Sequence, residues 1–208
     1  MRAVLAFAPG ADPTYVPLGL AALAAHIRAT VPGCELVPVD LSHAWWEQQA
    51  LSEPDWIGFS ALYPGQVLPT LALARFLAQQ VFPPPGRATR PPLVLGGASA
   101  SALRPAEALR ACPWLDGILA GEGEQGLVRL LGGGPPAAVA GLAWRDRGIV
   151  RVNRKPDTLA AADVPLPMFE DLDPRARWNP TPVLPVVFSR GCKGRRCRFC
   201  AHNLSYSG

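Results

Sequence analysis

Residues 55–62 read Asp-Trp-Ile-Gly-Phe-Ser-Ala-Leu, a short apolar run that ends in a loop of small residues. Similar runs recur along the chain, and the expected strands are Ala3–Ala8, Glu35–Val39, Trp56–Ser60, Leu93–Leu95 and Gly117–Ala120. Apolar residues at helical spacing fill the intervals, over Leu18–Ala29, Val67–Val81, Pro105–Ala111 and Gln125–Leu131. This alternation predicts an α/β fold, a flavodoxin-like (Rossmann-type) doubly wound parallel sheet.

The remainder of the chain is expected to leave this sheet. The α/β domain is predicted for residues 1–135, and a hairpin with a proline-rich linker for residues 136–182. Within residues 136–182, apolar and polar residues alternate over Gly141–Val152 on both sides of an Arg-Gly turn, as in a hairpin. After this stretch prolines recur and no hydrophobic period is visible, as in an extended linker. Residues 183–189, Val-Leu-Pro-Val-Val-Phe-Ser, predict one more buried strand, which opens a third segment at 183–208.

The composition places limits on the class of protein. A chain of 208 residues with 49% hydrophobic residues can bury one full core. No run reaches the roughly eighteen apolar residues that span a bilayer. Three of the five cysteines lie within nine residues, unlike a disulfide framework, so we expect a reducing, cytoplasmic location. Ten arginines follow Gly141, which predicts either a solvated face or a surface for phosphates, carboxylates or nucleic acid.

Small residues follow three of the expected strands. Because parallel strands bind ligands beyond their carboxyl ends, these loops are candidate binding segments. Glycine allows a close approach of backbone or ligand, and a serine hydroxyl can form a hydrogen bond to it. The alternative is that strand-to-helix turns require such residues anyway. The three loops are Ser60-Ala61-Leu62, Gly96-Gly97 and Gly121-Glu122-Gly123-Glu124.

Three cysteines, Cys192, Cys197 and Cys200, follow the last expected strand with the spacing C-x4-C-x2-C. Three thiolates on one loop can bind three irons of a 4Fe-4S cluster and leave the fourth iron open to an exogenous ligand. The competing metal is zinc, with His202 or a more distant residue as its fourth ligand. Arginines beside a zinc site would then argue for nucleic acid. Cys34 and Cys112 stand alone in apolar contexts and are expected to be buried fillers.

The loops and the cysteines together resemble the N-terminal part of cobalamin-dependent radical SAM enzymes. The loop resemblance runs over about residues 1 to 130, through Asp-Trp-Ile-Gly-Phe-Ser-Ala-Leu, Leu-Val-Leu-Gly-Gly-Ala-Ser-Ala and Asp-Gly-Ile-Leu-Ala-Gly-Glu-Gly-Glu, and Val16–Arg28 resembles that branch's first loop and helix. It implies that Ser60, Leu62, Gly96, Gly97, Gly121 and Glu122 bind cobalamin. It also implies that Cys192, Cys197 and Cys200 hold the cluster and that Phe199 packs near the adenine of S-adenosylmethionine.

Two stretches of this sequence depart from the motifs of the wider family. The cobalamin motif Asp-x-His-x-x-Gly reads Asp40-Leu-Ser-His-Ala-Trp45 here, so Ser42 stands at the position of the cobalt-ligating histidine. His43 is one residue out of register and is expected to be a loop histidine. The common cluster spacing is C-x3-C-x2-C, one residue shorter than here, although some cobalamin-dependent members have the four-residue gap.

The resemblance implies that the complete parent is a radical enzyme, a methyltransferase. Eight residues follow Cys200, so most of the radical SAM barrel is expected to be missing and the chain alone to be inactive, unless a separate chain supplies the rest. The expected partners are therefore small-molecule cofactors, with no membrane and no nucleic acid. Two alternatives stay open: a non-catalytic cobalamin-binding module and a zinc-stabilised nucleic-acid binder.

Overall fold

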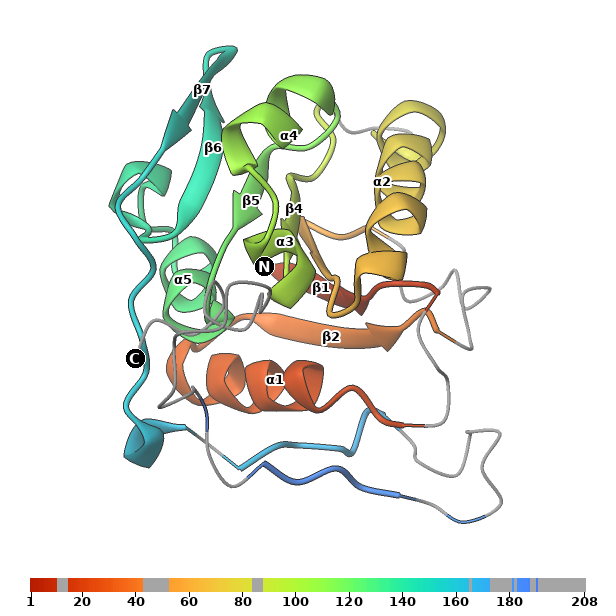
Figure 1. Cartoon of the computed structure of the whole chain (residues 1–208), viewed down its shortest axis with the longest axis vertical. Coiled ribbons are helices and arrows are strands. Elements are labelled where there is room, and N and C mark those ends of the chain that lie inside the picture. Colours follow the sequence, from red (N-terminus) through yellow and green to blue (C-terminus); the bar gives the residue numbers. More distant parts are fainter. Residues whose placement is uncertain are drawn as a thin grey trace.

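A seven-stranded sheet forms the centre of the computed structural model, which describes residues 1–10, 15–42, 53–83, 88–164, 166–172, 181, 183–187 and 190. Its strands are β1 Arg2–Phe7, β2 Glu35–Asp40, β3 Trp56–Ser60, β4 Leu93–Gly96, β5 Gly117–Leu119, β6 Leu142–Asp146 and β7 Ile149–Val152. Their order is β2-β1-β3-β4-β5-β6-β7, and the first five are parallel. The predicted flavodoxin-like order is therefore confirmed (Figure 1).

Helices cover both faces of the parallel part. The α-helices are α1 Leu18–Thr30, α2 Val67–Phe76, α3 Ala98–Ser101, α4 Pro105–Ala111 and α5 Gly123–Leu131. α2 continues through a π-helical turn at Leu77–Val81, and short 3-10 turns lie at Pro64–Gln66, Pro136–Ala138 and Ala161–Asp163. The helix predicted from Gln125 begins two residues earlier, and α3 was not predicted because four residues are too short for periodicity to reveal.

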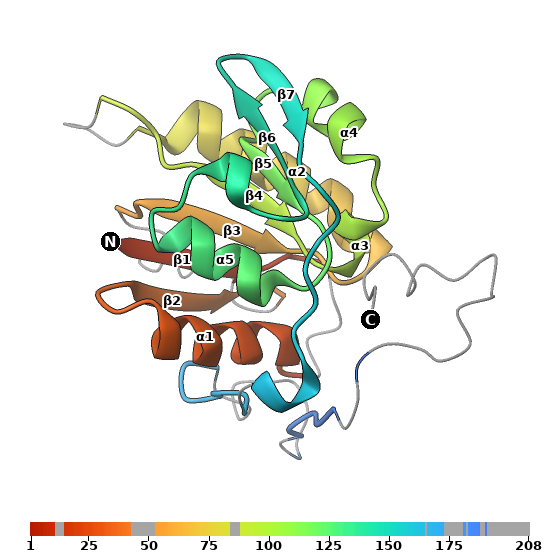
Figure 2. The same cartoon turned by 90° about the vertical axis from the view of Figure 1, so that its left-hand side faces the viewer.

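Alternate residues of β1 divide the core into two layers. Val4 and Ala6 pack with the α2 and α4 side of the sheet, where Leu77 and Leu109 are buried. Leu5, on the opposite face, packs with α1 and α5, where the buried side chains include Leu20, Ile27 and Leu127. This period-two division is what a strand covered on both faces requires, and Figure 2 shows α1 and α5 together on one face of the sheet.

The predicted hairpin continues the sheet instead of leaving it. β6 pairs antiparallel with β5, with Ile118 opposite Ala143, and β7 then pairs with β6. Arg147 and Gly148 both have positive φ angles, of 49° and 87°, as a tight two-residue turn requires. A Cβ atom on Gly117 would lie 3.2 Å from the Ala143 carbonyl oxygen, so glycine allows β6 to approach β5 closely.

The segment after the hairpin was expected to be an extended linker, but it packs back on the domain. We call residues 153–164 and 166–172 the return segment; it passes α5 and reaches α1 (Figure 1). Leu172 is buried in the α1 core layer, and the Met168 N–H donates to the Ala21 carbonyl oxygen at 3.2 Å. Arg28 forms an ion pair with Asp171.

The prediction of a buried strand at residues 183–189 is wrong for the part that the structure describes. Residues 183–187 form no strand, and the side chains of Val186 and Val187 are 70% and 56% exposed. A strand requires a neighbouring backbone that offers donors and acceptors, and among the described residues nothing pairs with this stretch. In the same part of the chain, none of the helices is both long and apolar enough to cross a bilayer.

Candidate functional site at the carboxyl edge of the sheet

Ser60 and Leu62 lie where β3 ends, next to the ends of β1 and β4. The Ala8 N–H donates to the Ser60 carbonyl oxygen at 3.0 Å, and the Ala61 N–H donates to the Gly96 carbonyl oxygen at 2.9 Å. These bonds extend the parallel ladder by one residue on each side. The strand order reverses between β1 and β3, which makes this the switch point at which doubly wound sheets bind ligands. Leu62 is 44% exposed there.

Gln66, which the sequence did not single out, fixes the shape of this loop. Its side chain is fully buried, and Nε2 donates to the Ala8 carbonyl oxygen at 2.6 Å. Its Oε1 accepts hydrogen bonds from the N–H groups of Leu62 at 2.8 Å and Tyr63 at 2.9 Å. One amide side chain thus joins the end of β1 to the loop after β3. The local sequence Pro-Gly-Gln does not predict that the glutamine side chain will make these bonds.

Gly97 allows the loop after β4 to pack on the loop after β3. Its φ angle is +95°, and a Cβ atom there would lie 2.5 Å from the Ala61 carbonyl oxygen. Ser99 completes the contact, because its N–H donates to the Ala61 carbonyl and its hydroxyl to the Leu62 carbonyl, both at 3.0 Å. The two predicted loops therefore form one hydrogen-bonded unit.

Gly96 differs from its neighbour in having no packing reason to be glycine. A Cβ atom there would be 3.6 Å from the Leu119 carbonyl oxygen and 3.8 Å from that of Phe59, which are ordinary contacts. Its backbone does not adopt a positive φ angle. The missing side chain leaves room at the half-buried edge of the sheet.

Gly121 and Glu122, the third predicted loop, contact the return segment. Gly121 has a φ angle of +83°, and a Cβ atom there would lie 2.5 Å from the side chain of Pro156. The Glu122 carboxylate accepts a hydrogen bond from the Leu159 N–H at 2.8 Å. Both residues therefore hold returning backbone in place, a role that the sequence alone did not indicate.

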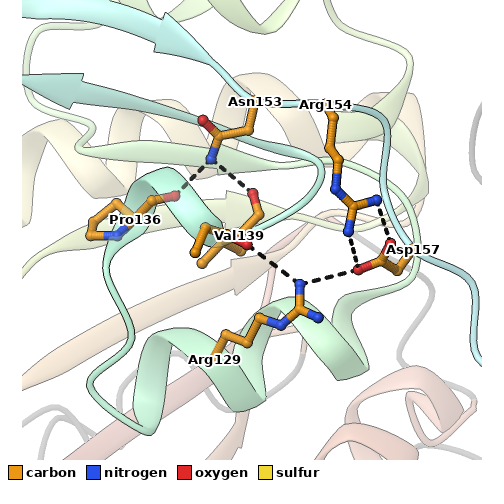
Figure 3. Close-up of polar contacts among 7 residues, drawn as sticks. Arg129, Pro136, Val139, Asn153, Arg154 and Asp157 are labelled. Atoms are coloured by element: carbon orange, nitrogen blue, oxygen red, sulfur yellow. Dashed lines mark hydrogen bonds and ion pairs between the residues drawn. The ribbon is translucent and has the colours of Figure 1, made fainter.

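Asp157 anchors the return segment beside α5 (Figure 3). Arg154 donates to both of its carboxylate oxygens, at 2.6 Å and 3.0 Å, and Arg129 of α5 donates to one of them at 3.1 Å. The hydrogen bond from Arg154 is the largest cause that holds the pKa of Asp157 below its ordinary value. Asn153 adds two bonds, to the carbonyl oxygens of Pro136 at 2.6 Å and Val139 at 2.8 Å.

The depressed pKa of Asp157 predicts a pH-dependent contribution to stability. Because the folded state favours the ionised carboxylate, this contribution is complete above the unfolded pKa of about 3.9 and is lost as pH falls through the lower folded value. Asp157→Asn should therefore lower the thermal midpoint modestly at pH 7 and not at all well below pH 4. Asp146→Asn, which removes the hairpin ion pair with Arg151, is the control. If the thermal midpoints of the wild type and D157N differed by the same amount down to the lowest pH, the stabilising role of the ionised Asp157 carboxylate would be contradicted.

Arg190 brings the C-terminal part of the chain to the start of α5. Its Nη1 lies 2.6 Å from Oε1 of Glu124 and 3.8 Å from Oε1 of Glu122. The side chain of Glu124 is 4% exposed and that of Arg190 24%. Two positions after Arg190 in the sequence comes Cys192.

The predicted cluster residues Cys192, Cys197, Cys200 and Phe199 lie outside the described residues, as do His43 and His202. Across the described ranges, no three His, Cys, Asp or Glu side chains converge on a metal position. Cys34 is half-buried and Cys112 is buried, and burial raises the pKa of both thiols. Both cysteines therefore suit apolar packing better than ligation. Ser42, at the position of the family's histidine, donates its N–H to the Asp40 carboxylate at 2.8 Å.

Comparison with known proteins gives both a relative and a fold. An uncharacterized methyltransferase of Pyrococcus horikoshii is 28% identical over a match that covers 93% of this chain and 42% of that protein. TsrM of Kitasatospora setae, a radical S-adenosylmethionine methyltransferase solved with cobalamin and a 4Fe-4S cluster, matches with a TM-score of 0.57. The match has 18% identity and covers 79% of this chain and 31% of TsrM.

A second solved structure carries the same fold. OxsB, a cobalamin-dependent S-adenosylmethionine radical enzyme solved with aqua-cobalamin and S-adenosylmethionine, matches with a TM-score of 0.62 and 18% identity over 82% of this chain and 24% of OxsB. The predicted resemblance to cobalamin-dependent radical SAM enzymes is therefore confirmed for the fold. No protein-family model matches the chain. The chain spans less than half the length of each of these three proteins.

Proposed function

We propose that this chain is the cobalamin-binding part of a radical SAM enzyme, with a methyltransferase as the complete activity. The observation that carries the proposal is the junction of two loops at the switch point, Ser60–Leu62 and Gly96–Gly97, in a fold shared with cobalamin-dependent enzymes. Cys192, Cys197 and Cys200 would hold a 4Fe-4S cluster. When bound, cobalamin would supply a transferable methyl group, and the cluster would supply the electron that cleaves S-adenosylmethionine.

The edge residues suit a large flat cofactor with an extended tail. Gly96 leaves space that its own packing does not require, and Leu62 offers exposed apolar surface next to it. The Ser60 side chain lies half-buried at the same edge and can donate a hydrogen bond to a ring nitrogen or amide. We assign the binding to these residues and to Gly97. Gly121 and Glu122 hold the return segment, so we do not assign them a direct contact with the cofactor.

Ser42 suggests how the cobalt would be ligated. A histidine at this position would be needed for the lower ligand, and a serine hydroxyl is a poor donor to cobalt by comparison. We therefore propose that cobalamin binds here without a histidine ligand from the Asp40–Trp45 stretch. The rest of the radical SAM barrel and the substrate pocket would come from further sequence or from a separate chain, because this chain spans less than half of its relatives.

Anaerobic reconstitution with iron, sulfide and hydroxocobalamin tests both cofactors at once. After desalting, the protein should be brown with broad absorbance near about 400 nm, contain roughly four irons per chain, and retain cobalamin. The triple variant C192A/C197A/C200A should lose the iron and keep the cobalamin. Gly96→Ala should fold like the wild type and bind cobalamin at least about tenfold more weakly, which is ~1.4 kcal/mol.

Other outcomes separate the alternatives. A colourless protein that holds one zinc and no cobalamin would contradict the proposal and favour a zinc-stabilised module. Cobalamin binding without iron uptake by the wild type would support the non-catalytic module instead. The doubly wound core supports that second candidate, since the buried side chains that the structure describes in its two layers all come from residues 1–172.

A further inference from the structure

We propose that Arg190, Glu122 and Glu124 form an ionic anchor that positions the cluster-bearing segment against the carboxyl edge of the sheet. The positioning of a cluster rests on the proposed function, whereas the ionic contacts of the anchor are a property of this chain. Arg190 is a positioning residue in this view: it acts through the cysteines that follow it. The three residues come from two parts of the chain separated by 66 positions.

The carboxylate of Glu124 requires a cation at this place. Its side chain is 4% exposed, and burying an unpaired carboxylate costs far more free energy than burying a paired one. The first turn of α5 supplies part of the compensation, because the amino end of a helix favours negative charge. Arg190 supplies the rest through a short charge-assisted contact of 2.6 Å.

Glu122 makes the anchor a junction of three segments. Its side chain is 7% exposed, one carboxylate oxygen lies 3.8 Å from Nη1 of Arg190, and the other accepts the Leu159 N–H. Two buried carboxylates this close to one guanidinium would repel each other without it. Arg190 and Glu122 together therefore join three parts of the chain: the loop after β5, the return segment and the stretch that contains Arg190.

Chain connectivity gives the anchor its proposed role. Cys192 follows Arg190 by two residues, so their Cα atoms can be no more than about 7 Å apart. The loop after β5 is also linked to the Gly96–Gly97 loop through Ser101, whose hydroxyl accepts from the Gly121 N–H at 2.8 Å and donates to the Gly97 carbonyl oxygen at 3.1 Å. Fixing Arg190 at α5 thus keeps the first cluster cysteine near the edge to which we assign cobalamin.

Limited proteolysis of the cofactor-free chain tests the anchor directly. Chymotrypsin can cut after Phe188, two residues before Arg190, and its rate follows the population in which this stretch is released. Glu124→Gln and Arg190→Gln should each speed this cut by about ten- to a hundredfold, the range expected for a lost charge-assisted hydrogen bond. Arg190→Lys should lie between them and the wild type. Arg151→Gln removes an exposed arginine ion pair from the hairpin, and chymotrypsin should cut this variant after Phe188 at the wild-type rate.

The reconstituted chain tests the positioning. With the cluster reduced and cobalamin as cob(II)alamin, pulsed electron paramagnetic resonance reports the distance between the two spins. E124Q and R190Q should keep their iron, since the cysteines are intact, but broaden this distance distribution, whereas R151Q should not. Wild-type rates of cleavage in E124Q and R190Q, or an unchanged spin distance in both, would overturn the inference. If the wild type takes up no cofactors, the proposed function fails, and proteolysis alone decides the anchor.

Discussion

Replacing Gly97 by alanine is expected to lower the free energy of unfolding by about 2–6 kcal/mol. One part is the backbone conformation, with φ +95° and ψ 173°, which is essentially confined to glycine and costs an L-residue about 1–3 kcal/mol. The other part is the new Cβ atom, which would lie 2.5 Å from the Ala61 carbonyl oxygen and 2.9 Å from its nitrogen. Backbone atoms cannot rotate away as a side chain could, so the two loops must separate. For a domain of ordinary stability, that is a large fraction of the total.

Gly133→Ala is the control for a positive φ angle without a steric contact. Gly133 has a similar φ angle of +80°, but a Cβ atom there would meet nothing within 4 Å. Urea unfolding followed by circular dichroism should therefore show a small decrease in the free energy of unfolding for G133A and a clearly larger decrease for G97A. The difference between the two variants reports the contact between the loops after β3 and β4 together with the glycine-specific backbone of Gly97. Equal losses would mean that this contact does not constrain the edge of the sheet.

The sequence predicted the parallel core well because the core repeats one simple pattern. Short apolar runs alternate with amphipathic or apolar helices, and local signals such as Pro105 at the first turn of α4 mark where elements begin. The parallel arrangement then brings the loops after β3 and β4 to one edge without further information. Ser60 and Gly96 are partners in the register for this reason.

Long-range contacts explain what the sequence could not predict. The hairpin residues alternate as in any hairpin, and nothing local says that β6 will pair with β5. The return segment is rich in proline and lacks periodicity, yet it is fixed by single contacts such as that of Leu159 with Glu122. Gly121-Glu122-Gly123-Glu124 looked like a ligand loop because its actual partners, Pro156, Leu159 and Arg190, are 30 or more residues away.

The predicted strand at 183–189 illustrates the opposite error. An apolar run was interpreted as a buried strand, but burial depends on partners as well as on hydrophobicity. Residues 183–187 have no strand beside them among the described residues, and their side chains are largely exposed. Exposed apolar residues of this kind fit a segment that would be covered in a complete radical SAM barrel, which is part of the proposed function.

Replacing Gln66 by alanine is expected to cost about 2–4 kcal/mol of stability, because it leaves three backbone groups without a partner. The Ala8 carbonyl would lose its donor at a buried position, and the half-buried N–H groups of Leu62 and Tyr63 would lose their acceptor. The measurement is again urea unfolding. Gln79→Ala is the control, because Gln79 bonds to Arg75 on the exposed side of its turn and should change stability little.

Gln66→Glu separates the role of hydrogen bonding from that of shape. A glutamate keeps the volume and can still accept from the Leu62 and Tyr63 N–H groups, but when ionised it would place an anionic oxygen against the Ala8 carbonyl. Burial raises the pKa of such a carboxyl, so the protonated form, which can donate to that carbonyl, is favoured in the folded state. The stability deficit of Q66E should therefore be small near pH 4 and grow as pH rises toward 8. A deficit that does not change with pH would show that this side chain acts by packing, and that the end of β1 and the loop after β3 are held together in some other way.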